Sequence, residues 1–271
     1  MKSGFSRIVL VAVLTLFSLA SVAAGRGGRG YPRRDRRDGA FRSPPAERPA
    51  PEVVNDRNLF RGAFRGGAGT LNYCQFAENT DLSGETFLVL ILHGRSGSGS
   101  DNLQQLATPA VRPLLEYVRA ERIKAVLLLP QCPERRGWIG DGMFDMVVEL
   151  VSAKCREFGV SEKHCLLTGF SMGGGACYPL MAQYPGHFAR ALVVSAGGFP
   201  DMAKNMRGDF YIAIGAEDRV VQPANAERMA SALRANGCST RLEILPGKDH
   251  VDGGAAAYRG DARNWLFRIR K

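Results

Sequence analysis

The stretch Gly169-Phe170-Ser171-Met172-Gly173 decides the fold. It stands between a short apolar run, Cys165–Thr168, and a stretch of helical length, Ala176–Tyr184. A serine on a sharp turn between a strand and a helix needs small residues on either side, and its hydroxyl then projects above the sheet. The N-terminus of the following helix points backbone N–H groups at the same place. The pattern predicts that Ser171 is a nucleophile; the alternative is a glycine-rich turn with a surface serine.

Short apolar runs and amphipathic stretches alternate on both sides of this motif. The apolar runs are 87–92, 125–130, 165–168, 191–195, 210–214 and 242–245, and the amphipathic stretches are 143–158, 176–184 and 224–236. Apolar runs without polar alternation are typical of parallel strands buried on both faces. The alternation predicts an α/β fold, a doubly wound and mostly parallel sheet with helices on both faces. The segment Thr70–Phe76 alternates more and is compatible with an antiparallel edge strand.

Chemistry is expected in the loops at the carboxyl ends of these strands. A nucleophilic serine needs a base, and His250 lies in the loop after the last predicted strand. The base needs a carboxylate on its other ring nitrogen, and Asp218 directly follows the strand at 210–214, with Glu217 as the neighbouring rival. We therefore predict Ser171 as nucleophile, His250 as base and Asp218 as its orienting acid.

The remaining histidines are interpreted as structural. His93 belongs to a turn that ends a strand, where its backbone position is expected to matter more than its ring. His164 is expected to begin a strand, and His187 follows a turn that ends a helix.

An ester-cleaving serine also needs two N–H donors for the oxyanion. One is expected from Met172, the residue after the nucleophile. The second is expected from the glycine-rich loop after the 87–92 strand, with Arg95 as first choice and Ser96 as alternative. Trp138 also follows a strand, and two roles stay open for it: packing on the acyl or aryl part of a substrate, or capping the core.

These motifs resemble those of the α/β-hydrolase superfamily, in particular its phospholipase/carboxylesterase group and its secreted polyhydroxybutyrate-depolymerase and feruloyl-esterase-like group. The resemblance rests on 92–94, 169–174, Asp218 with 220–221 after it, and His250. It implies hydrolysis of carboxylic esters or thioesters through a Ser-His-Asp triad, with no cofactor. One departure is that Asp249 and Val251 flank His250, where many relatives carry a second glycine.

The N-terminus resembles an export signal. Two basic residues precede an apolar run and then small residues, which is the order of a secretory signal peptide. We expect a signal peptide at 1–24, a flexible Arg/Gly/Pro-rich linker at 25–57 and a catalytic domain at 58–271. Residues 25–51 carry eight arginines against three acidic residues, so much of the net charge of +10 lies outside the expected domain. This segment is expected to contact anionic envelope polymers or lipid headgroups rather than nucleic acid.

Export permits disulfides, but the sequence does not choose a pairing among the six cysteines, which are Cys74, Cys132, Cys155, Cys165, Cys177 and Cys238. Core packing is favoured over a bridge for Cys177. The histidines are scattered and show no metal-binding spacing. Two other functions remain open: a serine peptidase with the same triad, and a non-enzymatic envelope-binding protein that uses the Arg-rich segment.

Overall fold

Eight strands form one mixed sheet in the part of the chain that the structure describes. The structure is a computed structural model, and it describes residues 56–134, 136–140 and 142–268. The strands are β1 (Leu59–Gly66), β2 (Gly69–Glu78), β3 (Phe87–Leu92), β4 (Ala125–Pro130), β5 (Cys165–Phe170), β6 (Arg190–Val194), β7 (Asp209–Gly215) and β8 (Thr240–Leu245). They are ordered β1-β2-β4-β3-β5-β6-β7-β8, and β3 to β8 run parallel. The expected α/β fold with a mostly parallel sheet is confirmed.

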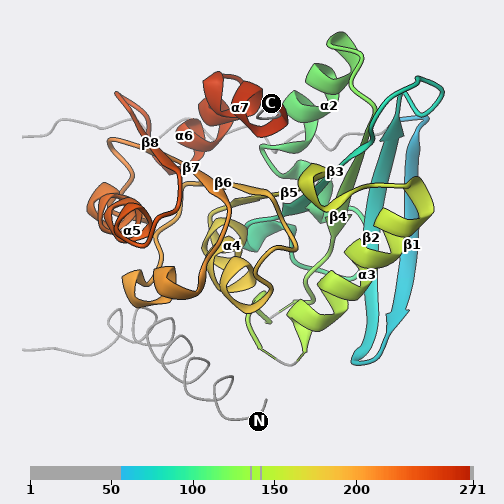
Figure 1. Cartoon of the computed structure of the whole chain (residues 1–271), viewed down its shortest axis with the longest axis horizontal. Helices are drawn as coiled ribbons and strands as arrows, with labels where there is room; N and C mark the ends of the chain where they lie inside the picture. Colours follow the sequence, from blue (N-terminus) through green and yellow to red (C-terminus); the bar gives the residue numbers. More distant parts are fainter. Residues whose placement is uncertain (1–55, 135, 141, 269–271) are drawn as a thin grey trace, which may run out of the picture. The chain divides into compact units, whose positions relative to one another are not determined.

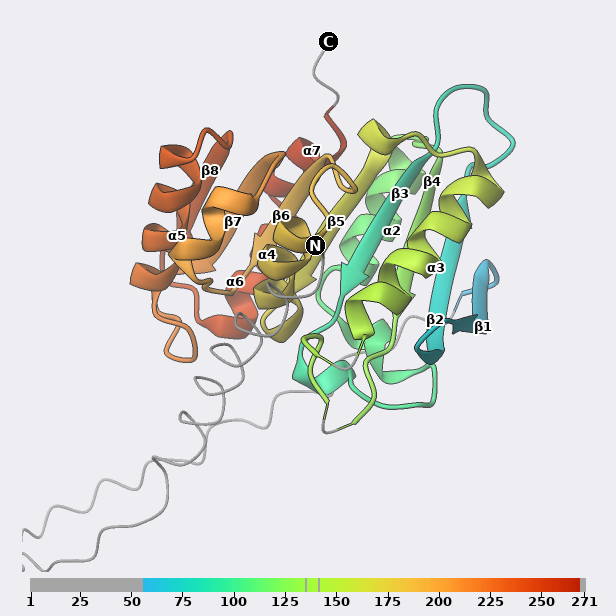
Figure 2. The same ribbon diagram turned by 60° about the horizontal axis from the view of Figure 1, so that its bottom comes forward.

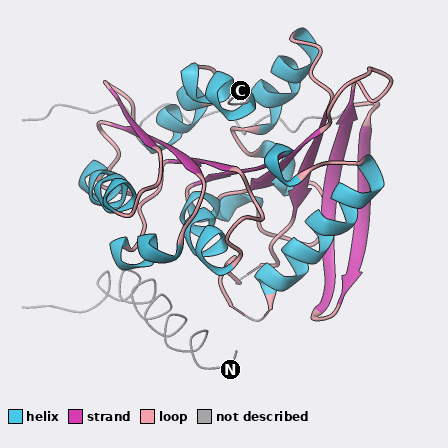
Figure 3. Ribbon diagram, viewed as in Figure 1, coloured by secondary structure: helices cyan, strands magenta, loops and turns pink. Residues whose placement is uncertain are grey.

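Helices cover both faces of this sheet (Figures 1 and 2). They are α2 (Val111–Ala120), α3 (Met143–Phe158), α4 (Met172–Gln183), α5 (Pro223–Ala235), α6 (His250–Ala257) and α7 (Asp261–Phe267). α3, α4 and α5 lie on one face, and α2, α6 and α7 lie on the other. Figure 3 shows the resulting order of helix, sheet and helix. Between the two layers, no residue of β3 to β7 is exposed.

Burial explains the apolar runs. All six residues of β4 and all six of β5 are buried, because helices cover both faces of these strands. β1 differs, since exposed and partly buried residues mix along its length. β3, β4 and α3 have the bounds that the sequence predicts.

The predicted edge strand is only partly correct. β2 is antiparallel to β4, as expected, but it is not at the edge, because β1 pairs with it on the outer side. The strand β1 was not predicted. Its alternation of arginine, glycine and aromatic residues has no continuous apolar run, so nothing marked it as a strand. The helices α2, α6 and α7 were also not predicted.

The expected signal peptide and nearly all of the Arg-rich linker lie outside the described residues. Within the described residues, no helix is long and apolar enough to cross a membrane.

Candidate active site

Ser171 lies at the sharp turn between β5 and α4. Its backbone has φ 54° and ψ −115°, a left-handed conformation that costs energy in a residue with a side chain. Glycines make the turn possible. A Cβ at Gly169 would lie 2.3 Å from the carbonyl oxygen of Gly173, so no larger residue fits at this position. The structure thus accounts for the glycines of the motif by backbone contact, and the turn presents the Ser171 side chain at the carboxyl end of β5.

The three residues predicted to act together are in contact. The Nε2 atom of His250 is 2.9 Å from Ser171 Oγ. The Nδ1 atom of His250 is 2.7 Å from Asp218 Oδ2. Because the Asp218 carboxylate only accepts, Nδ1 carries the proton and Nε2 is left as an acceptor for the Ser171 hydroxyl. This is the arrangement that a base acting on Ser171 requires.

Both oxygens of the Asp218 carboxylate take part in hydrogen bonds. Its side chain is 0% exposed, and its second oxygen, Oδ1, accepts from the N–H groups of Val220 and Val221 at 2.9 and 2.8 Å. The two amides fix the carboxylate plane, so that Oδ2 faces His250. The rival Glu217 is exposed and makes no contact with His250.

The position of His250 differs from the expectation. It is the first residue of α6, not part of a loop. The carboxylate of Asp249 caps that helix and accepts from the N–H groups of Val251 and Asp252 at 3.0 and 2.9 Å. The departure from the family pattern at Asp249 is therefore explained locally, because Asp249 caps α6. A second contact, missed in the sequence, comes from Ser195, whose Oγ donates to the His250 carbonyl at 3.0 Å.

One predicted oxyanion donor lies in α4, and the other lies in the loop that follows β3. Met172 is the first residue of α4, so its N–H has no carbonyl in the preceding turn of the helix to bond. Arg95 begins the 3₁₀ turn Arg95–Gly97 after β3. A Cβ at Gly173 would lie 2.0 Å from the Leu92 carbonyl oxygen, so α4 packs directly against the end of β3. This packing brings the first turn of α4 next to the loop that holds Arg95.

Trp138 has the second of its two possible roles. It is 1% exposed, and its indole Nε1 donates to the His93 carbonyl at 3.0 Å. A side chain buried in this way offers no surface to a substrate, so the substrate-contact alternative is not supported. Trp138 instead supports the loop after β3.

The His93 ring has contacts that the sequence did not indicate. The ring is 1% exposed and hydrogen-bonded through both nitrogens. The other two histidines have structural contacts, as expected. His164 is bonded to Ser161 and Glu85, and His187 lies 3.3 Å from Ser152.

All six cysteines are free thiols in this structure. Cys177 is buried, and its Sγ donates to the Gly173 carbonyl at 3.4 Å, which agrees with the expected core packing. Burial raises the pKa of the Cys132 thiol to about 12. No group of three or more His, Cys, Asp or Glu side chains could hold a metal ion among the residues described.

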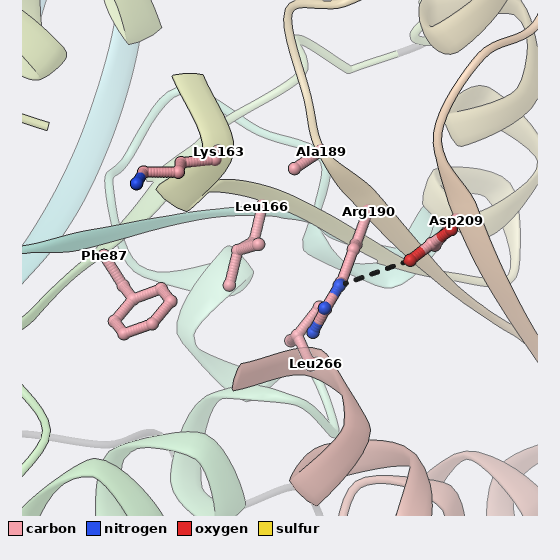
Figure 4. A pocket seen from close by; sticks show the side chains of 7 residues that line it. All are labelled: Phe87, Lys163, Leu166, Ala189, Arg190, Asp209 and Leu266. Carbon is pink, nitrogen blue, oxygen red and sulfur yellow. Dashed lines mark ion pairs between the residues drawn. The ribbon is translucent and has the colours of Figure 1, made fainter. Parts of the chain in front are cut away.

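A pocket at the opposite edge of the sheet is structural. It lies at the amino ends of β3, β5, β6 and β7 and is lined by Phe87, Lys163, Leu166, Ala189, Arg190, Asp209 and Leu266 (Figure 4). The guanidinium of Arg190 in this pocket interacts with neighbours within the protein. Its Nε atom lies 3.7 Å from Asp209 Oδ2, and its Nη1 atom donates to the Trp265 carbonyl at 2.9 Å. The guanidinium also stacks over the Trp265 ring. The triad lies at the other ends of these strands.

The comparisons with known proteins concern the family and the fold. Residues 141–256 match the dienelactone hydrolase family, a range that includes Ser171, Asp218 and His250. The fold is similar to that of a thermostable esterase, with a TM-score of 0.71 and 21% identity. The described part of the chain has the α/β-hydrolase fold. The alignment covers 78% of this chain and 62% of the esterase, so the chain spans less than two thirds of that protein.

Two further esterase structures have the same fold. Esterase PE8 aligns with a TM-score of 0.57 and 17% identity, over 73% of this chain and 99% of PE8. A feruloyl esterase module from Clostridium thermocellum aligns with a TM-score of 0.59 and 14% identity, over 78% and 88% of the two chains. No curated protein matches the sequence. These structures confirm the predicted α/β fold.

Proposed function

We propose that this α/β hydrolase is an exported serine esterase that cleaves carboxylic esters through Ser171, His250 and Asp218. One observation carries the proposal: an unbroken chain of hydrogen bonds runs from the Asp218 carboxylate through the His250 ring to the Ser171 hydroxyl. A serine hydroxyl is a poor nucleophile alone, and this chain supplies the base and fixes its tautomer. The strained backbone of Ser171 adds support, since such strain persists where function requires it.

The reaction proceeds in two acyl transfers. Ser171 Oγ attacks the ester carbonyl carbon while His250 Nε2 takes the hydroxyl proton, and the carbonyl π electrons move to oxygen. The N–H groups of Met172 and Arg95 hold this oxyanion. The C–O bond to the alcohol then breaks, and His250 returns the proton to the leaving oxygen. Water, deprotonated by His250, then attacks the acyl carbon. The bond from that carbon to Ser171 Oγ breaks, His250 returns the proton to Oγ, and the acid leaves.

Export rests on the N-terminal sequence. The order of basic, apolar and small residues in 1–24 favours a cleaved signal peptide and a secreted or periplasmic protein. The Arg-rich segment that follows is proposed to contact anionic envelope components. Such binding weakens with added salt, because charge interactions at a surface are screened. A vesicle sedimentation assay at two salt concentrations measures this separately from catalysis.

The test of the catalytic proposal is labelling of the purified mature protein with a fluorophosphonate. We expect wild type to be labelled and Ser171→Ala and His250→Ala to stay unlabelled. His187→Ala is the matched control, because His187 contacts Ser152 and no member of the triad. Ser171→Ala should lower kcat for an ester by on the order of 10⁶.

Labelling does not distinguish an esterase from a peptidase with the same triad. A panel of esters and of amides with matched acyl groups does so, and an esterase is expected to prefer the esters. Wild type that is folded but neither labelled nor active would overturn the proposal and favour a non-enzymatic binding protein. A Ser171→Ala variant that kept its esterase activity would also overturn it.

A further inference from the structure

The His93 side chain joins two loops at the carboxyl edge of the sheet. One ring nitrogen, Nε2, accepts from the N–H of Cys132 at 2.9 Å. The other, Nδ1, is 2.7 Å from the carbonyl oxygen of Gly94. A backbone N–H only donates and a carbonyl only accepts, so the proton is on Nδ1 and the ring is neutral. The tautomer is thus dictated by the two partners.

The Gly94 carbonyl belongs to the same peptide unit as the Arg95 N–H. The described residues contain no cis peptide bond. In a trans peptide the C=O and N–H bonds point in opposite directions. The bond from His93 Nδ1 holds the carbonyl on one side, and a second bond from the N–H of Gly97 holds it there at 3.0 Å. The Arg95 N–H must then point away from the ring.

We propose that His93 is a positioning residue for the oxyanion hole: its Nδ1–H holds the Gly94 carbonyl and thereby aims the Arg95 N–H at the oxyanion. The inference rests on the proposed function, because it takes the Arg95 N–H as one of the two donors. His93 touches no substrate and acts only through the peptide unit between Gly94 and Arg95.

The ring itself is held from two sides. A Cβ at Gly97 would lie 2.6 Å from His93 Cγ, so the 3₁₀ turn packs directly on the imidazole. On the other side, the ring centroids of His93 and Trp138 are 4.7 Å apart. Trp138 also bonds the His93 carbonyl. Burial lowers the pKa of His93 to about 4, so the ring stays in the neutral form that both hydrogen bonds require. These contacts leave the imidazole one orientation.

Two substitutions separate the two hydrogen bonds. The amide nitrogen of Asn takes about the place of Nδ1, so His93→Asn keeps a donor for the Gly94 carbonyl and loses the acceptor for Cys132. The amide oxygen of Gln reaches about the place of Nε2, so His93→Gln keeps the acceptor for Cys132 and loses the donor for Gly94. His187→Asn and His187→Gln are matched controls away from the triad, at a half-buried histidine.

The experiment measures kcat and KM for an ester, together with the Ki of a trifluoromethyl ketone, whose adduct with Ser171 places an oxyanion in the same hole. Loss of one oxyanion donor typically lowers kcat by 10²–10³. We expect His93→Gln to lower kcat by about 10², with KM little changed, and to raise the Ki by a similar factor. His93→Asn should keep kcat within about tenfold of wild type. Circular dichroism checks that each variant is folded.

If His93→Asn and His93→Gln lowered kcat equally, the inference would be overturned. A ring that only supports the fold would not depend on the hydrogen bond from Nδ1 to the Gly94 carbonyl more than on the other hydrogen bond. Loss of kcat without a change in Ki would also overturn it. The outcome is distinct from a failure of the proposed function, which wild type itself would reveal by lacking both activity and fluorophosphonate labelling.

Discussion

Replacing Asp218 by Asn tests whether the carboxylate fixes the tautomer of His250. The variant keeps the size and shape of the side chain. One oxygen of Asp218 accepts from the N–H groups of Val220 and Val221, and the other faces His250 Nδ1. An Asn amide must place its oxygen against the two N–H groups, because an NH₂ group there would face two donors and leave them unbonded.

The structure therefore dictates which way the amide turns. Its NH₂ group faces His250 Nδ1 and donates to it, so the imidazole proton moves to Nε2. Nε2 then donates to Ser171 Oγ and no longer accepts the proton of the hydroxyl. A triad in this wrong tautomer loses about 10⁴ in kcat, or about 5.5 kcal/mol of transition-state stabilisation.

The assay is kcat at neutral pH on an activated ester, compared with wild type. Glu217→Gln is the control, because it removes the neighbouring exposed carboxylate and should leave kcat unchanged. Asp218→Asn should unfold at nearly the same temperature as wild type, since its two backbone hydrogen bonds remain. An Asp218→Asn protein that kept kcat within tenfold of wild type would refute the role of the carboxylate in setting the tautomer.

Two other predictions concern the loop after β3. Gly173→Ala should abolish measurable esterase activity, because its Cβ would lie 2.0 Å from the Leu92 carbonyl oxygen and push the first turn of α4 away from β3. Gly260→Ala is the control, because a Cβ there makes only an ordinary contact, 3.6 Å from the Ala256 carbonyl oxygen. Because the pKa of His93 falls from 6.5 to about 4 on folding, the unfolded chain binds the proton first as pH drops. The contribution of His93 to the free energy of unfolding should thus fall by about 3 kcal/mol between pH 6.5 and pH 4. Urea titrations of wild type and His93→Asn should therefore show a difference in the free energy of unfolding that changes by about 3 kcal/mol over this range; parallel curves would contradict the assignment.

The buried parts of the fold follow from the sequence more closely than its edge does. β3 and β4 are continuous apolar runs because helices cover both faces, and such runs have clear ends. β1 has no such pattern. It pairs only with β2, and arginine and glycine residues share its eight positions with aromatic ones. A strand that pairs with one neighbour and is only partly buried needs no regular spacing of apolar residues, so its sequence shows no clear strand pattern.

α6 was missed for a different reason. Its sequence includes Gly253 and Gly254, which are poor helix formers and suggest a loop. The structure explains them by close approach, since a Cβ at Gly254 would lie 2.5 Å from the Phe170 ring and one at Gly253 2.9 Å from the Gly215 nitrogen. The helix forms because tertiary packing requires small residues there. Propensity alone gives the opposite expectation.

The candidate triad was predictable because each of its members has a local signature, namely a glycine turn or a position just after a strand. The contacts that orient it have none. Ser195 bonds the carbonyl of His250 across 55 residues, and His93 meets Cys132 across 39 residues. Only the strand order places these pairs together. Residues of these types occur throughout the chain, so the sequence offers no reason to select them.

The site is assembled mainly by backbone packed on backbone. A Cβ would lie within 2.3 Å of a carbonyl oxygen at three places: Gly169 against Gly173, Gly173 against Leu92, and Gly215 against Lys248. These contacts bring together the turn that carries Ser171, the end of β3 and the segment before His250. A methyl group at any of them must move a whole strand end, whereas a substitution at Asp218 changes one hydrogen bond. We therefore infer that the geometry of the triad depends on these three glycines as much as its chemistry depends on the side chains they bring together.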